Sequence, residues 1–281
     1  MRAEQITDPI AVHGEGPVWS EWWGGLRWVD MLAGDVLTLT ETGVERRHVG
    51  SVAACVRPRR EGGAVIALER GFALEEVDGA IRTLPELWTS PEIRMNEGGC
   101  DPDGRFYCGS MAYDQAKGAA SLYRLDPDGS VETVVEHVTV SNGIEWSPDG
   151  SLAYYNDTET LRVSVFDYEP ERGLTDRRDF AVLPDGGHPD GLTVDAEGCV
   201  WVAVPNAGCV LRYRPNGTLD GRVEVPGVTW ATACGFGGER LDRLFITTSK
   251  RDVDPKEEPL AGSLFAVDPG VRGMPAREFA G

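Results

Sequence analysis

The chain has 281 residues, with 35 glycines and 18 prolines spread along its length, and a formal net charge of −19 with a pI near 4.6. This length permits one large all-β domain or two smaller ones, and no boundary between domains is visible. The acidic balance argues against nucleic acid and anionic lipid as partners, because both require clustered Lys and Arg.

The six cysteines show no C-x-x-C spacing, so neither a zinc ribbon nor a thioredoxin-like motif is indicated. We expect buried free thiols, which fit a reducing cytoplasm. The opening residues, MRAEQITDPIAV, lack the apolar stretch of a signal peptide, and no segment reaches the roughly 18 apolar residues of a membrane-spanning helix. The sequence therefore disfavours secretion and a membrane partner, and it predicts a cytoplasmic location.

A turn followed by a β-strand recurs six times along the chain. The copies are WGGLRWVD (23–30), EGGAVIALE (61–69), DPDGRFYCG (101–109), SPDGSLAYYND (147–157), DAEGCVWVA (195–203) and GGERLDRLFIT (237–247). Each copy precedes a second strand pattern with its own polar turn, as in GDVLTLTETG and SLYRLDPDG. The chain is thus built from six similar units.

A repeat of roughly 38 to 48 residues with several strands per unit is typical of a β-propeller blade. The sequence therefore predicts an all-β fold, with one six-bladed β-propeller domain over residues 1–281 and about 47 residues in each blade. Turns containing Asp-Gly recur in any all-β protein, so a β-sandwich or a double barrel is the alternative. The pairing of the two turn-strand patterns in all six units favours the propeller.

One polar residue precedes each of four similar turns by about the length of one short strand. These residues are Glu15 in EGPVWS, Asn96 in NEGGCDPDG, Asn142 in NGIEWSPDG and Asp190 in DGLTVDAEG. The first strand of each propeller blade lines the central channel, so equivalent positions converge at one mouth of it. Each residue alone also fits a turn or a solvated surface. Because all four lie at a similar distance ahead of their turns, however, we expect their side chains to converge at one mouth of the channel. Two carboxylates and two amide carbonyls suit calcium, magnesium or manganese better than a zinc-type site.

Several segments resemble those of the gluconolactonase family, which includes senescence marker protein (regucalcin) and the luciferin-regenerating enzymes. They are GEGPVW, RMNEGGCDPDGRFYCGSMA, SNGIEWSPDG, HPDGLTVDAEGCVWVA and TTSKRDVDP, and together they span nearly the whole chain. The resemblance implies a six-bladed propeller with one divalent metal ion in its channel, calcium foremost, with magnesium, manganese or zinc as alternatives. It also implies Glu15, Asn142 and Asp190 as metal ligands, with Asp190 as the general base.

The same resemblance implies the substrate side of the site. Arg94 and Asn96 match two residues of the family's substrate segment, whereas Glu97 stands where the family usually has Asp. Asp114 matches a position at which regucalcin-like members place a Glu that touches sugar hydroxyls. A solvated loop acid explains Asp114 equally well, so both interpretations stay open.

The leading hypothesis is a metal-dependent lactonase that hydrolyses a small-molecule sugar lactone, such as gluconolactone, to the aldonic acid. His188, two residues before Asp190, competes for the role of base, although we favour a surface-loop histidine. The alternatives are a calcium-dependent esterase or phosphotriesterase of the propeller type and a non-catalytic calcium-binding regulatory protein. Arg94 and Asn96 argue against the last, because metal binding alone needs neither. The lactone, the metal and the oligomeric state, monomer or small homo-oligomer, stay open.

Overall fold

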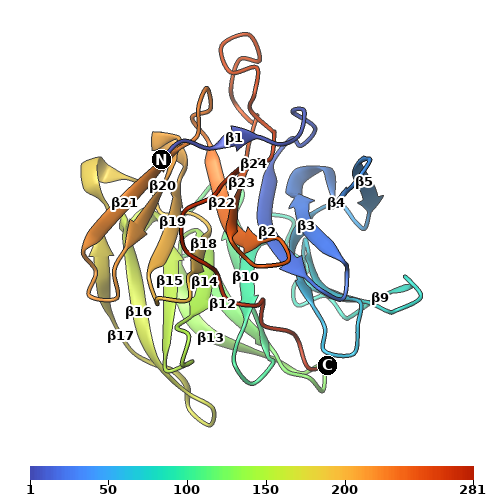
Figure 1. Cartoon of the computed structure of the whole chain (residues 1–281). Helices are drawn as coiled ribbons and strands as arrows, with labels where there is room; N and C mark the ends of the chain where they lie inside the picture. Colours follow the sequence, from blue (N-terminus) through green and yellow to red (C-terminus); the bar gives the residue numbers. More distant parts are fainter.

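The computed structural model describes residues 1–281 and contains six four-stranded antiparallel β-sheets around a central axis (Figure 1). Neighbouring innermost strands contact one another in a closed ring. The sheets follow one another around the axis in chain order, as the change of colour in Figure 1 shows. The fold is a six-bladed β-propeller, which confirms the architecture predicted from the repeats.

Each blade contributes one strand to each of four concentric positions. The innermost strands are β2 (Gly14–Ser20), β6 (Ala53–Pro58), β10 (Ile93–Cys100), β14 (Ser141–Trp146), β18 (Leu192–Val194) and β22 (Ala231–Gly237). The second strands are β3 (Gly25–Asp30), β7 (Ala64–Leu68), β11 (Phe106–Ala112), β15 (Leu152–Asp157), β19 (Val200–Val204) and β23 (Arg243–Thr248). The third strands are β4 (Asp35–Thr40), β8 (Phe72–Glu75), β12 (Ala120–Leu125), β16 (Arg162–Glu169), β20 (Cys209–Tyr213) and β24 (Phe265–Val267). The outermost strands are β5 (Gly43–His48), β9 (Ile81–Thr83), β13 (Val131–Val138), β17 (Gly173–Val182), β21 (Leu219–Glu224) and β1 (Glu4–Gln5).

The recurring turn-strand of the sequence is the second strand of every blade, and its companion pattern is the third. The second strands lie between two others and face neighbouring blades on both sides, so they are continuous apolar runs such as VWVAV in β19, which is entirely buried. Outermost strands such as GVERRH in β5 are mostly exposed and polar. Four short 3-10 helices complete the structure: η1 (Met31–Ala33), η2 (Thr158–Thr160), η3 (Pro184–Gly186) and η4 (Pro205–Ala207).

The two ends of the chain close the ring. Strand β1 pairs antiparallel with β24, joining Glu4 to Ala266 and completing the sixth blade (Figure 1). The last residues then run back across the molecule, where the Phe279 N–H donates to the Pro58 carbonyl over 2.8 Å and its ring is buried. The N-terminal strand covers the exposed edge of the last blade, and the C-terminal segment ties that blade to the second.

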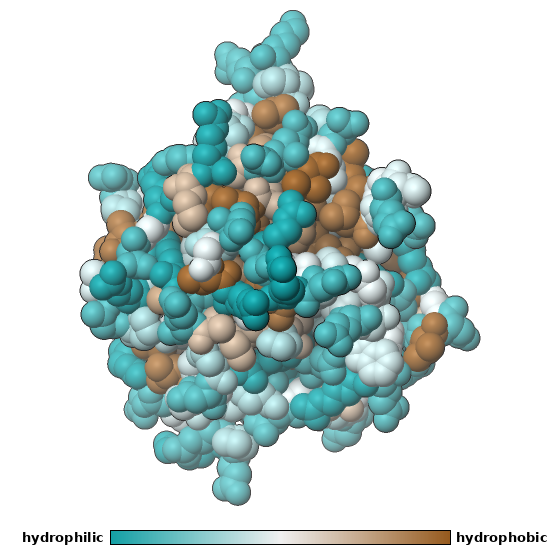
Figure 2. Space-filling model, viewed as in Figure 1, coloured by the Kyte–Doolittle hydropathy of each residue, from teal (hydrophilic) through white to brown (hydrophobic).

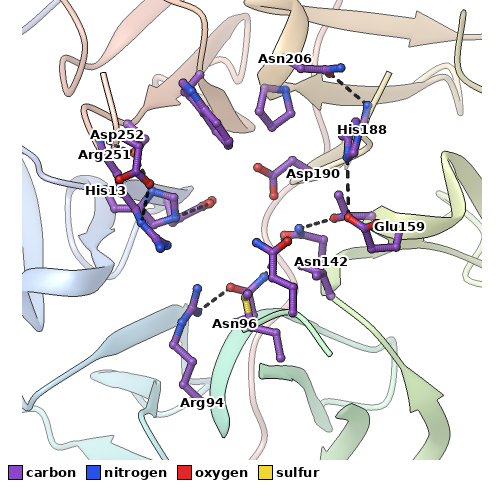
Figure 3. A pocket seen from close by; sticks show the side chains of 18 residues that line it. His13, Arg94, Asn96, Asn142, Glu159, His188, Asp190, Asn206, Arg251 and Asp252 are labelled. Atoms are coloured by element: carbon purple, nitrogen blue, oxygen red, sulfur yellow. Dashed lines mark hydrogen bonds and ion pairs between the residues drawn. The ribbon is translucent and has the colours of Figure 1, made fainter. Parts of the chain in front are cut away.

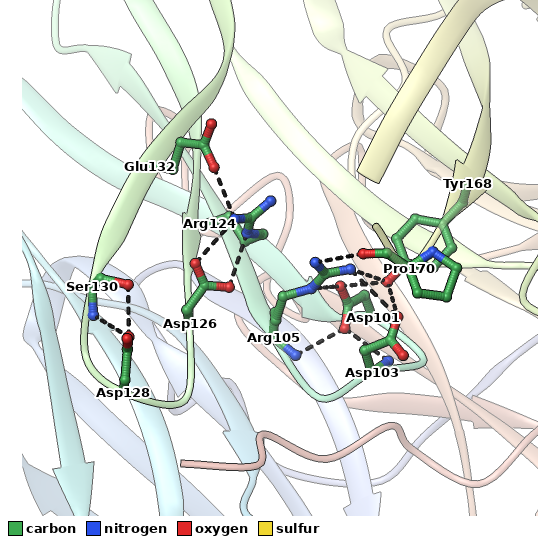
Figure 4. A network of polar contacts seen from close by, with 10 residues as sticks. All are labelled: Asp101, Asp103, Arg105, Arg124, Asp126, Asp128, Ser130, Glu132, Tyr168 and Pro170. Atoms are coloured by element: carbon green, nitrogen blue, oxygen red, sulfur yellow. Dashed lines mark hydrogen bonds and ion pairs between the residues drawn. The ribbon is translucent and has the colours of Figure 1, made fainter. Parts of the chain in front are cut away.

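The acids of the repeated turns have a structural role. Asp101 is 1% exposed; its Oδ1 accepts the N–H groups of Asp103 and Arg105, and its Oδ2 accepts Arg105 Nε over 2.6 Å and the Tyr168 hydroxyl over 2.7 Å (Figure 4). Tyr168 belongs to β16, so this turn joins the third blade to the fourth. Asp195 likewise accepts two N–H groups of its own turn. These repeated acids therefore hold turns and blades together.

Hydrophilic side chains cover most of the face seen in Figure 2, in keeping with the strongly acidic composition. All six cysteines are buried free thiols, as the sequence predicts. None of the helices has the length and apolar character needed to cross a bilayer.

Candidate metal and substrate site

A cavity of about 310 Å³ lies at the end of the channel where β2 and β14 begin (Figure 3). Only three of its 18 lining residues are hydrophobic. Pockets for drug-like ligands are lined mainly by apolar side chains. This lining therefore suits a small ligand with many hydroxyl groups or charges.

The four polar residues that precede the repeated turns, Glu15, Asn96, Asn142 and Asp190, all line this cavity. Glu15 and Asn142 are the second residues of β2 and β14, Asn96 lies in the middle of β10, and Asp190 comes just before β18. All four are buried, from 2% exposure for Glu15 to 8% for Asp190. Figure 3 shows Asn96, Asn142 and Asp190 arriving from different blades around one central space. The predicted convergence is therefore present.

Irregularities in three innermost strands aim these side chains into the channel. The register of β2 with β3 shifts just after Glu15, and the register of β14 with β15 shifts around Asn142. In β10 the shift leaves Asn96 and Glu97 opposite one residue of β11, Gly109. A β-bulge of this kind breaks strict alternation and re-aims a side chain. It lets two consecutive polar residues serve the same site.

The orientation of the Asn142 amide follows from its hydrogen bonds. The Thr158 hydroxyl donates its only hydrogen to the Pro189 carbonyl over 2.8 Å, so it can only accept from Asn142. The atom that faces Thr158 is accordingly Nδ2, at 2.8 Å. Asn142 Oδ1 then points toward Asn96 Nδ2, 3.2 Å away. The site thus gains a carbonyl oxygen, a suitable ligand for a hard cation.

Arg94 and Asn96 form a connected pair beside this oxygen. Arg94 Nη1 donates to Asn96 Oδ1 over 2.7 Å, and Asn96 Nδ2 donates to the Ser141 carbonyl over 2.8 Å. The amide oxygen of Asn96 accepts from a charged guanidinium over 2.7 Å, whereas that of Asn142 accepts only from a neutral amide over 3.2 Å, so Asn96 is the weaker candidate for holding a metal. Burial lowers the pKa of Arg94 to about 10, which leaves the guanidinium charged at neutral pH, and its Nε has no hydrogen-bond partner.

Three buried carboxyl groups form a cluster, and two of them, Glu15 and Asp190, line the cavity. Oxygens of Glu15, Glu97 and Asp190 lie within 4.8 Å of one another. Burial is the largest cause that raises the pKa of each group, well above the ordinary value for Glu15 and Asp190 and to about 7 for Glu97; nearby carboxylates add to every shift. Two oxygens bound to one calcium ion lie at most about 5 Å apart. The cluster fits one hard cation, which would replace the protons these groups hold.

His13 does not neutralise the cluster. Its Nε2 lies 3.5 Å from Glu15 Oε1, and its Nδ1 contacts the Ser249 hydroxyl at 2.8 Å. Burial, followed by the charges of Arg94 and Arg251, lowers the pKa of His13 to about 3. The imidazole is therefore neutral near pH 7, and its contact with Glu15 is a polar contact rather than an ion pair.

The two remaining sequence candidates occupy different positions. His188 lines the rim with a 41% exposed side chain, and its Nδ1 lies 3.9 Å from Glu159 Oε1. Asp114 lies in the exposed loop after β11, where its Oδ1 accepts the Ala116 N–H over 3.0 Å, and it does not line the cavity. The next residue, Gln115, does. A substrate contact by Asp114 stays a prediction.

Several cavity residues had no recognisable pattern in the sequence. Trp230 lies in an irregular segment and Thr158 begins the short helix η2, and neither segment has a repeat signature. Arg251 lies in TTSKRDVDP, a segment that carries only the resemblance. His13 precedes Glu15 by two residues and was detectable only through that proximity. Glu97 was visible as a substitution within a known motif, but its approach to two other acids depends on the bulge in β10.

Comparison with known proteins identifies the family of the chain. Residues 13–250 match the family described as the SMP-30/Gluconolactonase/LRE-like region. The chain is 37% identical to regucalcin of Danio rerio, with 95% of each chain covered, and 36% identical to a pentonolactonase of Haloferax volcanii, with 98% of this chain and 97% of the other covered. A solved regucalcin structure from Agrobacterium tumefaciens superimposes with a TM-score of 0.91 at 26% identity, covering 99% of this chain and 97% of the other. The chain therefore belongs to the SMP-30/gluconolactonase/LRE-like family.

Proposed function

We propose that this protein is a metal-dependent hydrolase that opens a sugar lactone to its aldonic acid. The observation that carries the proposal is the placement of the charged Arg94–Asn96 pair beside buried carboxylates in a small polar cavity. Relatives whose names describe lactone hydrolysis, including the pentonolactonase and a 6-deoxy-6-sulfogluconolactonase of Pseudomonas putida that is 34% identical, support the reaction class.

Glu15, Asn142 and Asp190 would hold the divalent ion. When bound, such an ion favours ionised carboxylates, lowers the pKa of a water molecule and polarises a carbonyl group. Asn142 presents its carbonyl oxygen because Thr158 fixes the amide. Asn156 Nδ2 donates to the backbone carbonyl of Asp190 over 2.6 Å, and this bond holds in place the backbone that carries the Asp190 side chain. The residues are thus positioned before substrate arrives, which favours catalysis.

Asp190 is the proposed general base. It lines the cavity, and once ionised it can accept a proton from the water that attacks the lactone carbonyl. Arg94 and Asn96 would bind the ring hydroxyls or the carbonyl oxygen, since a guanidinium offers several donors in a fixed plane. The leaving oxygen of the opened ring stays on the same molecule, so the products are the aldonate and a proton.

The test of this function is a panel of five- and six-carbon aldonolactones offered to the chelator-treated protein. Calcium, magnesium, manganese and zinc are added back separately, and ring opening is followed by the acid released. We expect no activity after chelation and recovery with at least one hard cation. Faster hydrolysis of aryl or organophosphate esters would identify an esterase instead. Metal binding without turnover of any lactone would support the regulatory alternative.

The same assay separates the two candidate bases. Asp190→Asn keeps an oxygen near the cation but removes the proton acceptor, so hydrolysis should fall by a factor on the order of 10² or more. Weakened metal binding should remain detectable by calorimetry at raised metal concentration. His188→Ala should stay within about tenfold of the parent, because its side chain lies on the exposed rim. An active Asp190→Asn variant and an inactive His188→Ala variant would assign the base to the histidine.

A further inference from the structure

Glu97 brings a third carboxylate to the cluster that it forms with the cavity-lining Glu15 and Asp190. Its side chain is buried, with 2% exposure for the residue, and Oε2 has no hydrogen-bond partner. Glu15 Oε2 is also buried and unpartnered, and carboxylate oxygens of both residues lie within 4.8 Å of one from Asp190. Buried polar atoms in native proteins nearly always have partners, so two unpartnered carboxylate oxygens in one cluster of acids are suited to binding a cation.

The backbone is shaped to admit this carboxylate. The bulge in β10 places Asn96 and Glu97 opposite Gly109, and so aims both toward the channel. Glu97 Oε2 packs against Gly191, where an added Cβ would lie 3.1 Å from that oxygen and 2.4 Å from the Cβ of Ala233. Gly191 directly follows Asp190. The absence of a side chain at residue 191 therefore lets the carboxylate of Glu97 approach that of Asp190.

The remaining charged neighbour of Glu97 does not satisfy it. Arg57 Nη2 lies 4.0 Å from Glu97 Oε1, which is beyond hydrogen-bond distance. Arg57 Nη1 instead donates to its own neighbour, the Val56 carbonyl, over 2.8 Å. The competing explanation, that Glu97 exists only as the counter-charge of Arg57, leaves Oε2 without a role.

We propose that Glu97 is a direct ligand of the divalent cation, forming with Glu15, Asn142 and Asp190 a site that has three carboxylates. This inference rests on the proposed metal dependence and adds a ligand to it. Affinity for calcium increases with the number of charged ligands, and oxygens that lie within about 5 Å of one another can bind the same ion. The third carboxylate therefore gives this protein tighter calcium binding than Glu15, Asn142 and Asp190 alone would provide.

Calorimetric titration of chelator-treated, full-length protein with calcium at pH 8 tests the proposal. Glu97→Gln keeps the shape of the side chain and removes its charge, so affinity should fall on the order of 10²-fold. Glu97→Asp withdraws the carboxylate by one methylene and should lose about tenfold. The matched control is Glu145→Gln, because Glu145 lines a second cavity together with Arg57 but is outside the cluster. The control should stay within about threefold of the parent.

Thermal melting without metal distinguishes ligation from the competing explanation. If Glu97 belongs to a cluster of like charges, Glu97→Gln removes repulsion, and the metal-free variant melts at the parent temperature or above it. If Glu97 serves only Arg57, the substitution leaves a buried guanidinium without a counter-charge and lowers the melting temperature. Unchanged calcium affinity in Glu97→Gln overturns the proposal, and so does a loss of affinity accompanied by a lower metal-free melting temperature.

Failure of this inference is distinguishable from failure of the proposed function. A parent protein that binds calcium and hydrolyses lactones, with a Glu97→Gln variant of equal affinity, refutes only the role of Glu97. A parent protein that binds no divalent cation at millimolar concentration refutes both.

Discussion

Calcium affinity should depend strongly on pH, because the cluster holds protons in the metal-free protein. Burial raises the pKa of Glu97 from 4.5 to about 7 and raises those of Glu15 and Asp190 well above their ordinary values. A cation binds the ionised carboxylates, so binding must release these protons. Between pH 7 and pH 6 the ionised fraction of Glu97 falls about fivefold, from about one half to about one eleventh, which corresponds to about 1 kcal/mol of calcium-binding free energy.

We therefore expect calcium affinity to fall at least about fivefold between pH 7 and pH 6. Titration calorimetry in two buffers with different ionisation enthalpies measures the protons released directly, and we expect at least about one per cation at pH 6. A site made of exposed, already ionised acids would release none. Constant affinity between pH 6 and pH 8 would refute the view that burial keeps the cluster protonated.

The same pKa shifts determine whether the folding stability of the metal-free protein rises or falls with pH. The raised pKa of Glu97 contributes stability that is fully present below pH 4.5 and is lost as pH rises through about 7. The lowered pKa of His13 acts in the other direction, with stability present above pH 6.5 and lost as pH falls toward about 3. Above pH 6.5 the carboxyl contribution alone still changes. The metal-free melting temperature should fall from pH 6.5 to pH 8, and a rise over that range would contradict this reasoning.

Three substitutions test the other assignments. Glu15→Ala should abolish calcium-induced thermal stabilisation and lactone hydrolysis while preserving the β-rich circular dichroism spectrum, and a fully active variant would remove Glu15 from the site. Arg94→Ala should lower kcat/KM on polar lactones on the order of 10²-fold with calorimetric calcium affinity nearly unchanged, so loss of calcium binding would show that Arg94 is misplaced. Asp114→Glu should change the kcat/KM ratio between five- and six-carbon lactones less than Gln115→Ala does, because Gln115 lines the cavity. The reverse order would give Asp114 the substrate contact.

The repeats predicted the blades because the second strands carry a local signal, an apolar run preceded by a glycine-containing turn, as in DAEG before VWVAV. The closure of the ring lacks such a signal. Strand β1 is only two residues long, Glu4–Gln5, and it pairs with β24 near the other end of the chain. A pairing this short and this distant in sequence is set by the completed ring and not by a local pattern.

The site was predictable to the extent that it follows the repeat. Glu15, Asn142 and Asp190 stand at similar points relative to their turns, so equivalence of the blades brings them together. Glu97 was not predictable in this way, because strict alternation would place it on the opposite face of β10 from Asn96. Only the register of β10 against β11 reveals the bulge that brings both residues to the channel.

Burial alone does not distinguish the acids proposed to bind metal from the structural acids; their hydrogen-bond partners do. Asp101 is as deeply buried as Glu97, yet its two oxygens accept two backbone N–H groups, a guanidinium and a tyrosine hydroxyl. Glu15 and Glu97 each keep an oxygen with no partner, beside a third carboxyl group. Such an arrangement destabilises the metal-free fold, and ordinary selection for stability would replace it with a neutral or paired group. A bound cation would supply the missing charge, so the orphaned oxygens that weaken the metal-free fold support the proposed metal site.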